Sequence, residues 1–196
     1  MRSLVCPRSS RWPSVLRRFK KNEQGATAIE FAMVIGPFLF LLFGIMSVGF
    51  YYFVVFSLEH AVETAARVIR TGQAQTQLPS AMTVSQFKSL VCTKLPPMMA
   101  CGGTDKIRVN VQSFAGYGAV TPPSCTDGGG NLIATAGQSY NPGGANAIVL
   151  VTVCYEWTLS NTMANIPYWI SPGGARMNNG STMVQASVAF TTEPYN

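Results

Sequence analysis

Residues 20–44 read KKNEQGATAIEFAMVIGPFLFLLFG, and this stretch decides how the chain is organised. It leads into an uncharged run of 28 residues, from Phe31 to Leu58. At a rise of about 1.5 Å per residue, about 20 apolar residues cross the hydrocarbon core of a bilayer. A buried helix of a water-soluble protein seldom runs this far without a polar face. The sequence therefore predicts a transmembrane helix near the N-terminus.

The formal net charge of +6 is confined to the residues before this helix. Residues 1–25 hold seven Lys and Arg side chains and one Glu, whereas the other 171 residues hold seven basic and seven acidic ones. A basic excess on one flank of a span follows the positive-inside rule. It predicts a cytoplasmic N-terminus and export of the residues after Leu58. It also argues against a nucleic-acid partner, because the rest of the chain has no basic excess.

A conventional secretory signal is an alternative, since Ser47 and Gly49 give a small-x-small pattern. The apolar region of such signals has about 7–15 residues. The run here is longer and continues past that pattern as FYYFVVF, residues 50–56. Length therefore favours a retained helix over a cleaved signal.

Glu30 is the one carboxylate at the start of this run. A charge at the bilayer centre costs about 2.5–3.5 kcal/mol on insertion scales. One interpretation is that Glu30 reaches back to the interface and avoids part of this cost. The other depends on its position, because Glu30 is the fifth residue after Gly25, with Ala26 the first.

A basic leader that ends in Gly, followed by an apolar helix with Glu at its fifth position, resembles the type IV prepilin cleavage signal. The resemblance implies that a prepilin peptidase cuts between Gly25 and Ala26 and leaves the helix attached. It also implies that Glu30 pairs with the new α-amine of a neighbouring subunit and sets the register between helices. A buried carboxylate needs such a partner.

Two features differ from classical type IV pilins and resemble the Tad (Flp) branch instead. The first mature residue is Ala26 rather than Phe, and the leader is long, with 25 residues. GATAIEFAMV is similar to the start of TadE-like pilus-assembly proteins. The segments ARVIRTGQAQ, VCTKLPPMMACG, IRVNVQSF, VTVCYEWTL and VAFTTEPY extend this resemblance over most of residues 22–196. It implies a non-enzymatic, pseudopilin-like structural component without cofactor. Its implied partners are the prepilin peptidase, other Tad pilins, inner-membrane assembly proteins and membrane lipid.

The remaining pattern predicts an α+β fold with a small antiparallel sheet of about three to four strands. The helix should continue as an amphipathic helix to Arg70, with Gly72 as its C-cap. A short helix is expected over Val84 to Leu95, and strands over 107–114, 147–159 and 181–190, the middle one covered on both faces. Gly116–Asn146 is a long irregular excursion, either a surface loop or a contact loop for other subunits.

Four cysteines follow the helix, and an even number in an exported domain predicts disulfides. Three pairings are possible. Cys92 with Cys101 and Cys125 with Cys154 are favoured because both close short loops. A metal site is not indicated, because no CxxC motif is present and His60, the one histidine, is far along the chain from the cysteines.

Three parts are therefore expected: a basic cytoplasmic leader (1–25), the transmembrane helix with its extension (26–72) and an exported α+β domain (73–196). The location implied is the inner membrane, crossed once, with the C-terminal domain periplasmic or extracellular. The alternative function is an unprocessed single-span membrane protein whose exported domain binds a ligand or envelope partner.

Overall fold

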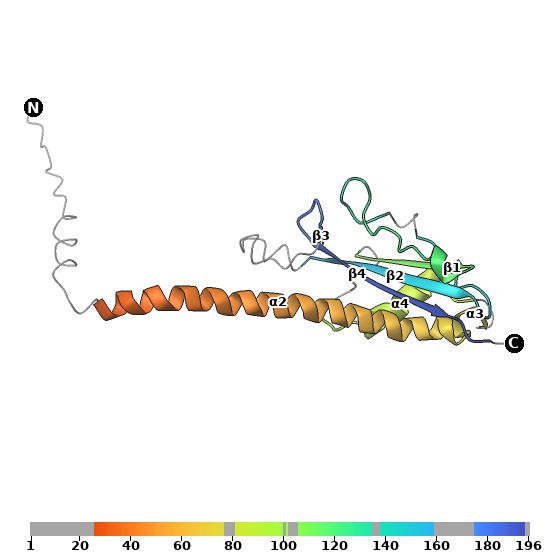
Figure 1. Cartoon of the computed structure of the whole chain (residues 1–196), viewed down its shortest axis with the longest axis horizontal. Helices are drawn as coiled ribbons and strands as arrows, with labels where there is room; N and C mark the ends of the chain where they lie inside the picture. The colour runs from red at the N-terminus through yellow and green to blue at the C-terminus, as the bar shows by residue number, and fades with distance from the viewer. Residues whose placement is uncertain are drawn as a thin grey trace, which may run out of the picture. The chain divides into compact units, whose positions relative to one another are not determined.

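A computed structural model describes residues 26–76, 81–99, 101, 106–134, 138–158 and 175–194. It confirms the expected α+β fold (Figure 1). The helices are α2 (Ala26–Arg70), α3 (Gln73–Thr76), α4 (Val84–Lys94) and the 3₁₀ turn η2 (Tyr117–Ala119), and the strands are β1 (Ile107–Phe114), β2 (Ile148–Trp157), β3 (Ala175–Arg176) and β4 (Thr182–Thr191). Two compact units are present, one ending at Ile45 and the other comprising Met46–Asn196.

The C-terminal part of α2 carries one buried face. Its members recur at three- or four-residue spacing, so they lie on one side of the helix. They are Val54, Leu58, Ala61, Val62, Ala65, Ala66 and Ile69, each at most 3% exposed. The small alanines let the helix lie close to the sheet. The helix ends at Arg70, and Gly72 adopts a positive φ of 76° and donates its N–H to the Ile69 carbonyl, as expected of a C-cap.

The sheet has the strand order β1-β2-β4-β3, and every pairing is antiparallel. Alternate residues of each long strand face α2 and α4. These are Ile107, Val109 and Val111 of β1, Val149, Val151, Val153, Tyr155 and Trp157 of β2, and Val184 and Ala186 of β4, all within one core. The central strand β2 is buried on both faces from Val149 to Tyr155, which confirms the expectation drawn from its continuous apolar sequence.

The excursion between β1 and β2 covers the sheet on the side away from α2 (Figure 1). Cys125 in the excursion is bonded to Cys154 of β2, with 5.6 Å between their Cα atoms. Arg108 of β1 donates from Nε to the Ile133 carbonyl at 2.8 Å. The described part of this segment is therefore fastened to the sheet. The sequence predicted the disulfide but not the contact of Arg108.

The same excursion also covers the middle of the outer edge of β1. Tyr140 forms a parallel bridge with Val111, and the main chain of Val111 exchanges hydrogen bonds of 2.8 Å with Ser139 and Asn141. The Tyr140 ring lies 6.1 Å from the Phe87 ring of α4. Burial raises the pKa of Tyr140 to about 12, so its hydroxyl is neutral at ordinary pH. Another chain therefore cannot pair with β1 at Val111.

Helix α4 agrees closely with the helix expected over Val84 to Leu95. Thr83 caps its first turn, because its Oγ1 accepts from the Gln86 N–H while the Gln86 side chain accepts from the Thr83 N–H. Leu95 is the C-cap and Pro96 follows, which prevents the helix from continuing. Cys92 in the last turn is bonded to Cys101, with 5.8 Å between their Cα atoms.

The two disulfides give a testable connectivity. Mass mapping of the non-reduced protein should find Cys92 linked to Cys101 and Cys125 linked to Cys154. Loops of 9 and 29 residues are closed. Replacing both cysteines of a pair with Ser should therefore lower the free energy of unfolding by about 2.6 and about 3.6 kcal/mol respectively, by the chain-entropy relation.

Cys6→Ser is the control for this experiment, and it should leave the stability unchanged because Cys6 belongs to neither disulfide. Four free thiols in the non-reduced protein would contradict the oxidised structure. A different pattern of linked peptides would contradict the connectivity alone.

Candidate functional site at the start of the long helix

The described residues begin at Ala26, which is already helical and belongs to α2. Gly25 and the rest of the leader, where the sequence predicts cleavage, lie outside the described residues. Glu30 is the fifth residue after Gly25, and its side chain on α2 is exposed. Among the described residues, none forms a hydrogen bond or ion pair with Glu30.

The helix around Glu30 presents apolar side chains to its surroundings. From Thr27 to Ile45 the side chains are exposed except for Ile35 and Gly44, which are half-buried. Those more than half exposed include Ile29, Phe31, Met33, Val34, Phe38, Leu41, Phe43 and Ile45. An apolar surface of this extent requires lipid or other protein around it. Pro37 lies inside the helix and removes one backbone donor, which leaves the Met33 carbonyl without its usual intrahelical partner.

Within the described part of the chain, one helix is long and apolar enough to cross a membrane. It comprises Thr27–Arg70, and its most apolar 18-residue window has a mean hydropathy of 2.4 with none of the window buried. Length and composition define this candidate span. A core helix of a soluble protein would instead be mostly buried. The exposure of this window therefore agrees with the transmembrane helix that the sequence predicts.

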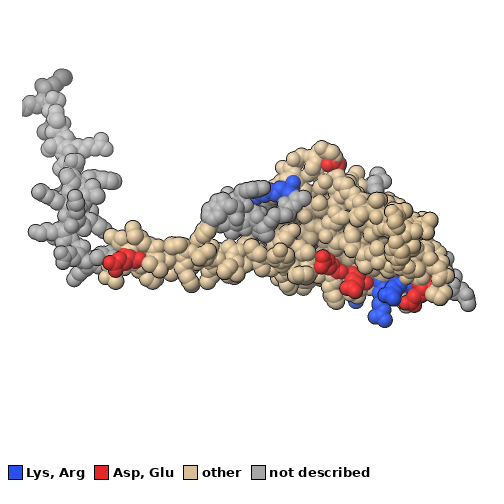
Figure 2. Space-filling view, viewed as in Figure 1, with Lys and Arg blue, Asp and Glu red and all other residues tan. Residues whose placement is uncertain are grey.

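Charged side chains are distributed unevenly along α2. Figure 2 shows the first part of the helix as an uncharged surface apart from an acidic patch near its start. Charges return at Glu59 and Glu63 and continue with Arg67 and Arg70, all on the exposed side of the helix. The exposed side thus changes from apolar to polar between Phe56 and Glu59, while the opposite side remains in the protein core.

An aromatic cluster lies just before this change. The Trp157 ring, at the end of β2, is 5.8 Å from the Phe50 ring and 6.2 Å from the Tyr51 ring. Tyr52 and Phe56 stack at 6.1 Å on the exposed side of α2. In the sequence, the FYYFVVF run is only a continuation of the apolar segment. Its contact with Trp157 joins two segments far apart in the sequence, which no local pattern reveals.

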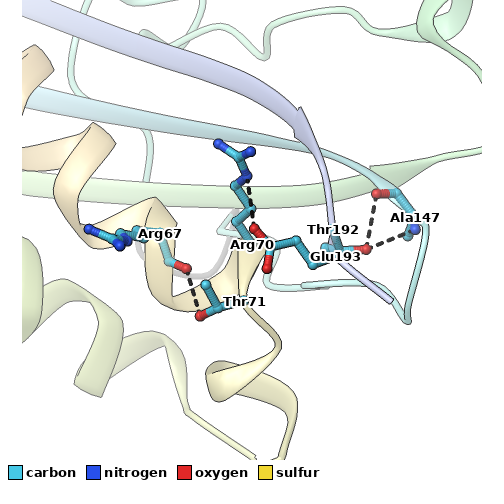
Figure 3. Close-up of polar contacts among 6 residues, drawn as sticks. All are labelled: Arg67, Arg70, Thr71, Ala147, Thr192 and Glu193. Atoms are coloured by element: carbon cyan, nitrogen blue, oxygen red, sulfur yellow. Dashed lines mark hydrogen bonds and ion pairs between the residues drawn. The ribbon is translucent and has the colours of Figure 1, made fainter. Parts of the chain in front are cut away.

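A second set of contacts, also missed from the sequence, fastens the C-terminal segment to the end of α2 (Figure 3). The Glu193 N–H donates to the Arg70 carbonyl at 2.8 Å, so it satisfies one of the carbonyls that a helix end leaves free. The Arg70 and Glu193 side chains form an ion pair of 3.6 Å, and both are more than half exposed. The backbone bond fixes the position of the segment, and the exposed ion pair adds little stability.

Thr192 makes the buried part of this contact. It is 2% exposed. Its Oγ1 accepts from the Ala147 N–H at 2.9 Å and donates to the Gly144 carbonyl at 2.7 Å (Figure 3 draws the contact with Ala147). The residue therefore connects the end of β4 to the loop before β2. Helix α2, this loop and the C-terminal segment are held together at one end of the unit.

The glycine-rich run Asp127–Asn131 forms a closed turn. Asp127 accepts hydrogen bonds on Oδ1 from the Asn131 N–H at 2.8 Å and the Gly129 N–H at 2.9 Å. The bond from Asn131, helped by that from Gly129, lowers the pKa of Asp127. The side chain therefore shapes its own loop. No group of three or more His, Cys, Asp or Glu residues that could hold a metal ion is found among the described residues.

Removing the Thr192 hydroxyl should destabilise the unit more than removing the Glu193 charge. Thr192→Val keeps the shape but removes the two hydrogen bonds that the buried hydroxyl makes with the half-buried Ala147 N–H and the Gly144 carbonyl, so the free energy of unfolding should fall by about 1–3 kcal/mol, at about 0.5–1.5 kcal/mol for each bond. Glu193→Gln loses only an exposed ion pair, so the fall should be about 0–1 kcal/mol. Urea unfolding of the full chain in detergent measures both. If the two variants lower the free energy of unfolding equally, the Thr192 hydroxyl does not contribute more to this contact than the Glu193 charge, contrary to the prediction.

These features define a protein with one candidate membrane-spanning helix, whose C-terminal part is built into a disulfide-bonded α+β unit. Residues 25–67 match the family described as TadE-like protein, so the chain carries a TadE-like domain there. This family is associated with Tad pilus assembly, and its members are generally non-enzymatic pilus components. The match begins at Gly25 and ends at Arg67 within α2, so the resemblance of the later segments remains a prediction. No curated protein and no solved structure matches the chain.

Proposed function

We propose that this chain is a membrane-anchored, pseudopilin-like structural component of a Tad (Flp) pilus assembly system, processed by a prepilin peptidase between Gly25 and Ala26. The observation that carries the proposal is the position of the family match relative to the sequence motif. The match begins at Gly25, Glu30 is the fifth residue after that Gly, and the residues from Ala26 onward are helical. Cleavage there would remove the leader and leave the helix intact with a new α-amine at its end.

The orientation follows from charge and cysteine chemistry. Seven basic groups against one acidic group in residues 1–25 favour a cytoplasmic N-terminus. Two disulfides in the unit that follows favour an oxidising compartment outside the inner membrane. The chain then consists of a leader (1–25), the helix with its extension (26–72) and an exported domain (73–196), with its single span in the inner membrane.

In this proposal Glu30 accepts the α-amine of Ala26 from a neighbouring processed subunit. The Glu30 carboxylate is exposed, has no partner among the described residues and is the only charge on α2 before Glu59. An isolated carboxylate in lipid costs about 2.5–3.5 kcal/mol on insertion scales, which a second charge of opposite sign can offset. Because the two groups are four residues apart on identical helices, their pairing also sets the axial shift between neighbours.

The exposed apolar surface of α2 supplies the rest of the contact with assembly partners. Other Tad pilins and inner-membrane assembly proteins would meet this surface in the membrane, where close packing and the few polar groups determine association. The folded unit from Met46 to Asn196 would then be carried along, because α2 contributes a buried face to its core.

Two substitutions separate cleavage from pairing. Gly25→Ala should leave a precursor that is heavier by the 25-residue leader on immunoblots. Glu30→Gln should leave membrane insertion intact or improve it, because a neutral amide is less costly to bury than a carboxylate. It should nevertheless reduce pilus formation and the recovery of pilus partners, since one member of a charge pair is lost.

Glu59→Gln is the matched control, because it removes an exposed carboxylate from the same helix at a position outside the proposed pairing. This variant should assemble like the wild type. Normal pilus formation and partner recovery with Glu30→Gln would show that Glu30 is a tolerated interfacial carboxylate. If the wild type and Gly25→Ala both migrate at the mass of the precursor on immunoblots, the chain is instead an unprocessed single-span membrane protein.

A further inference from the structure

Phe50, Tyr51, Tyr52, Phe53, Phe56 and Trp157 form a group that we name the aromatic collar. We propose that the aromatic collar lies at the boundary between the hydrocarbon core and the headgroup layer at the Glu59 end of the span, so that the end of β2 lies at the membrane surface. This inference depends on the proposed function only in requiring that α2 crosses a membrane. It adds the register of the helix in the bilayer and a lipid-contacting surface on the folded unit.

The length of helix between the two flanking carboxylates supports this register. Glu30 and Glu59 are 29 residues apart, which corresponds to about 44 Å of helix. A bilayer including its headgroup regions is about 40–45 Å thick, whereas its hydrocarbon core is about 30 Å. The uncharged run is therefore too long for the core alone and fits the whole bilayer. The headgroup region on each side is then about 7 Å deep, so Phe56 falls in it, and the residues from Phe50 to Phe53 lie within about 7 Å of it, at the outer end of the hydrocarbon core.

Side-chain exposure shows that this part of α2 has two different surroundings. Val54 and Leu58 are at most 1% exposed and pack in the protein core. On the other side, Tyr52, Phe53 and Phe56 are 52%, 45% and 61% exposed. Polar residues begin at Glu59 and His60, both exposed. Aromatic side chains are enriched at membrane–water interfaces, and the change to charged residues directly after Phe56 marks the aqueous side.

Trp157 brings the folded unit to the same level. It belongs to β2, yet its ring contacts those of Phe50 and Tyr51 on α2 at 5.8 and 6.2 Å. Side chains in contact share one depth in a bilayer. If Phe50 and Tyr51 lie at the boundary between the hydrocarbon core and the headgroup layer, the C-terminal end of β2 must lie there as well.

The chemistry of the surface favours lipid over a partner helix as its occupant. Helix contacts within membranes use small residues that allow close backbone approach. The exposed side of the collar is instead made of Tyr52, Phe53 and Phe56, whose rings keep backbones apart. It is also continuous with the exposed Met46 and Val48, which belong to the apolar candidate span.

Spin-label depth measurements on the full chain test this register. Phe43, Phe53, Phe56 and Glu63, all exposed, are replaced one at a time by Cys in a Cys6→Ser background and labelled with a nitroxide. The proteins are reconstituted in vesicles of phosphatidylethanolamine and phosphatidylglycerol. For each nitroxide, the rate of collision with oxygen, which concentrates in lipid, is compared with the rate of collision with a nickel chelate, which stays in water. The ratio of the two rates gives the depth of the label. The label at 43 should be deep, those at 53 and 56 shallow but within the bilayer, and that at 63 aqueous.

Each other outcome has a distinct meaning. Labels at 53 and 56 as accessible to nickel as the label at 63, with 43 still deep, would overturn the collar and leave membrane anchoring intact. If neither oxygen nor the nickel chelate collides with the labels at 53 and 56, protein and not lipid covers this surface. That result would also overturn the proposed lipid contact of the aromatic collar. An aqueous label at 43 would contradict the membrane span and with it the proposed function.

Discussion

Burial of one face of α2 against the sheet is the interaction on which the rest of the structure depends. From Val54 to Ile69 this face is almost fully enclosed, and its alanines at 61, 65 and 66 allow the strands to approach the helix closely. Losing it would expose the inner side chains of β1, β2 and β4 together, since all three strands share this core. Each large apolar side chain buried on this face contributes about 1.5–3 kcal/mol to the stability of the folded unit.

This arrangement explains why a single helix can be apolar along most of its length. One part, ending near Phe56, exposes its apolar side chains, and the part from Val54 onward buries a face in protein. The overlap around the aromatic collar is where the two surroundings meet. A helix that also forms part of the core of the folded unit cannot be displaced without disturbing that unit. In the proposed function, this connection lets events at the start of α2, such as cleavage and pairing of Glu30, determine where the folded unit is held.

Local patterns predicted the elements but not the contacts between distant segments. The alternation in IRVNVQSF predicted β1, and the continuous apolar run in VLVTV predicted a strand covered on both faces. Even cysteine number and short loops predicted the two disulfides that the structure contains. Apart from the Cys125–Cys154 disulfide, the fastening of the excursion to the sheet was not predicted, because Arg108 and Tyr140 carry no signal of their partners. The contacts of Thr192 with Ala147 and of Trp157 with Phe50 are equally long-range. At the start of α2, spacing alone identifies Glu30, and its proposed partner belongs to another chain.

The identity of the first residue of the mature protein tests the central claim most directly. N-terminal sequencing of the wild-type protein extracted from membranes distinguishes a processed assembly component from an unprocessed membrane protein. The account predicts a sequence beginning with Ala26, ATAIEF, with the leader absent. A sequence beginning at residues 1–2, or one beginning after Gly49, would contradict it, because in either case Glu30 could not be the fifth residue of a mature helix.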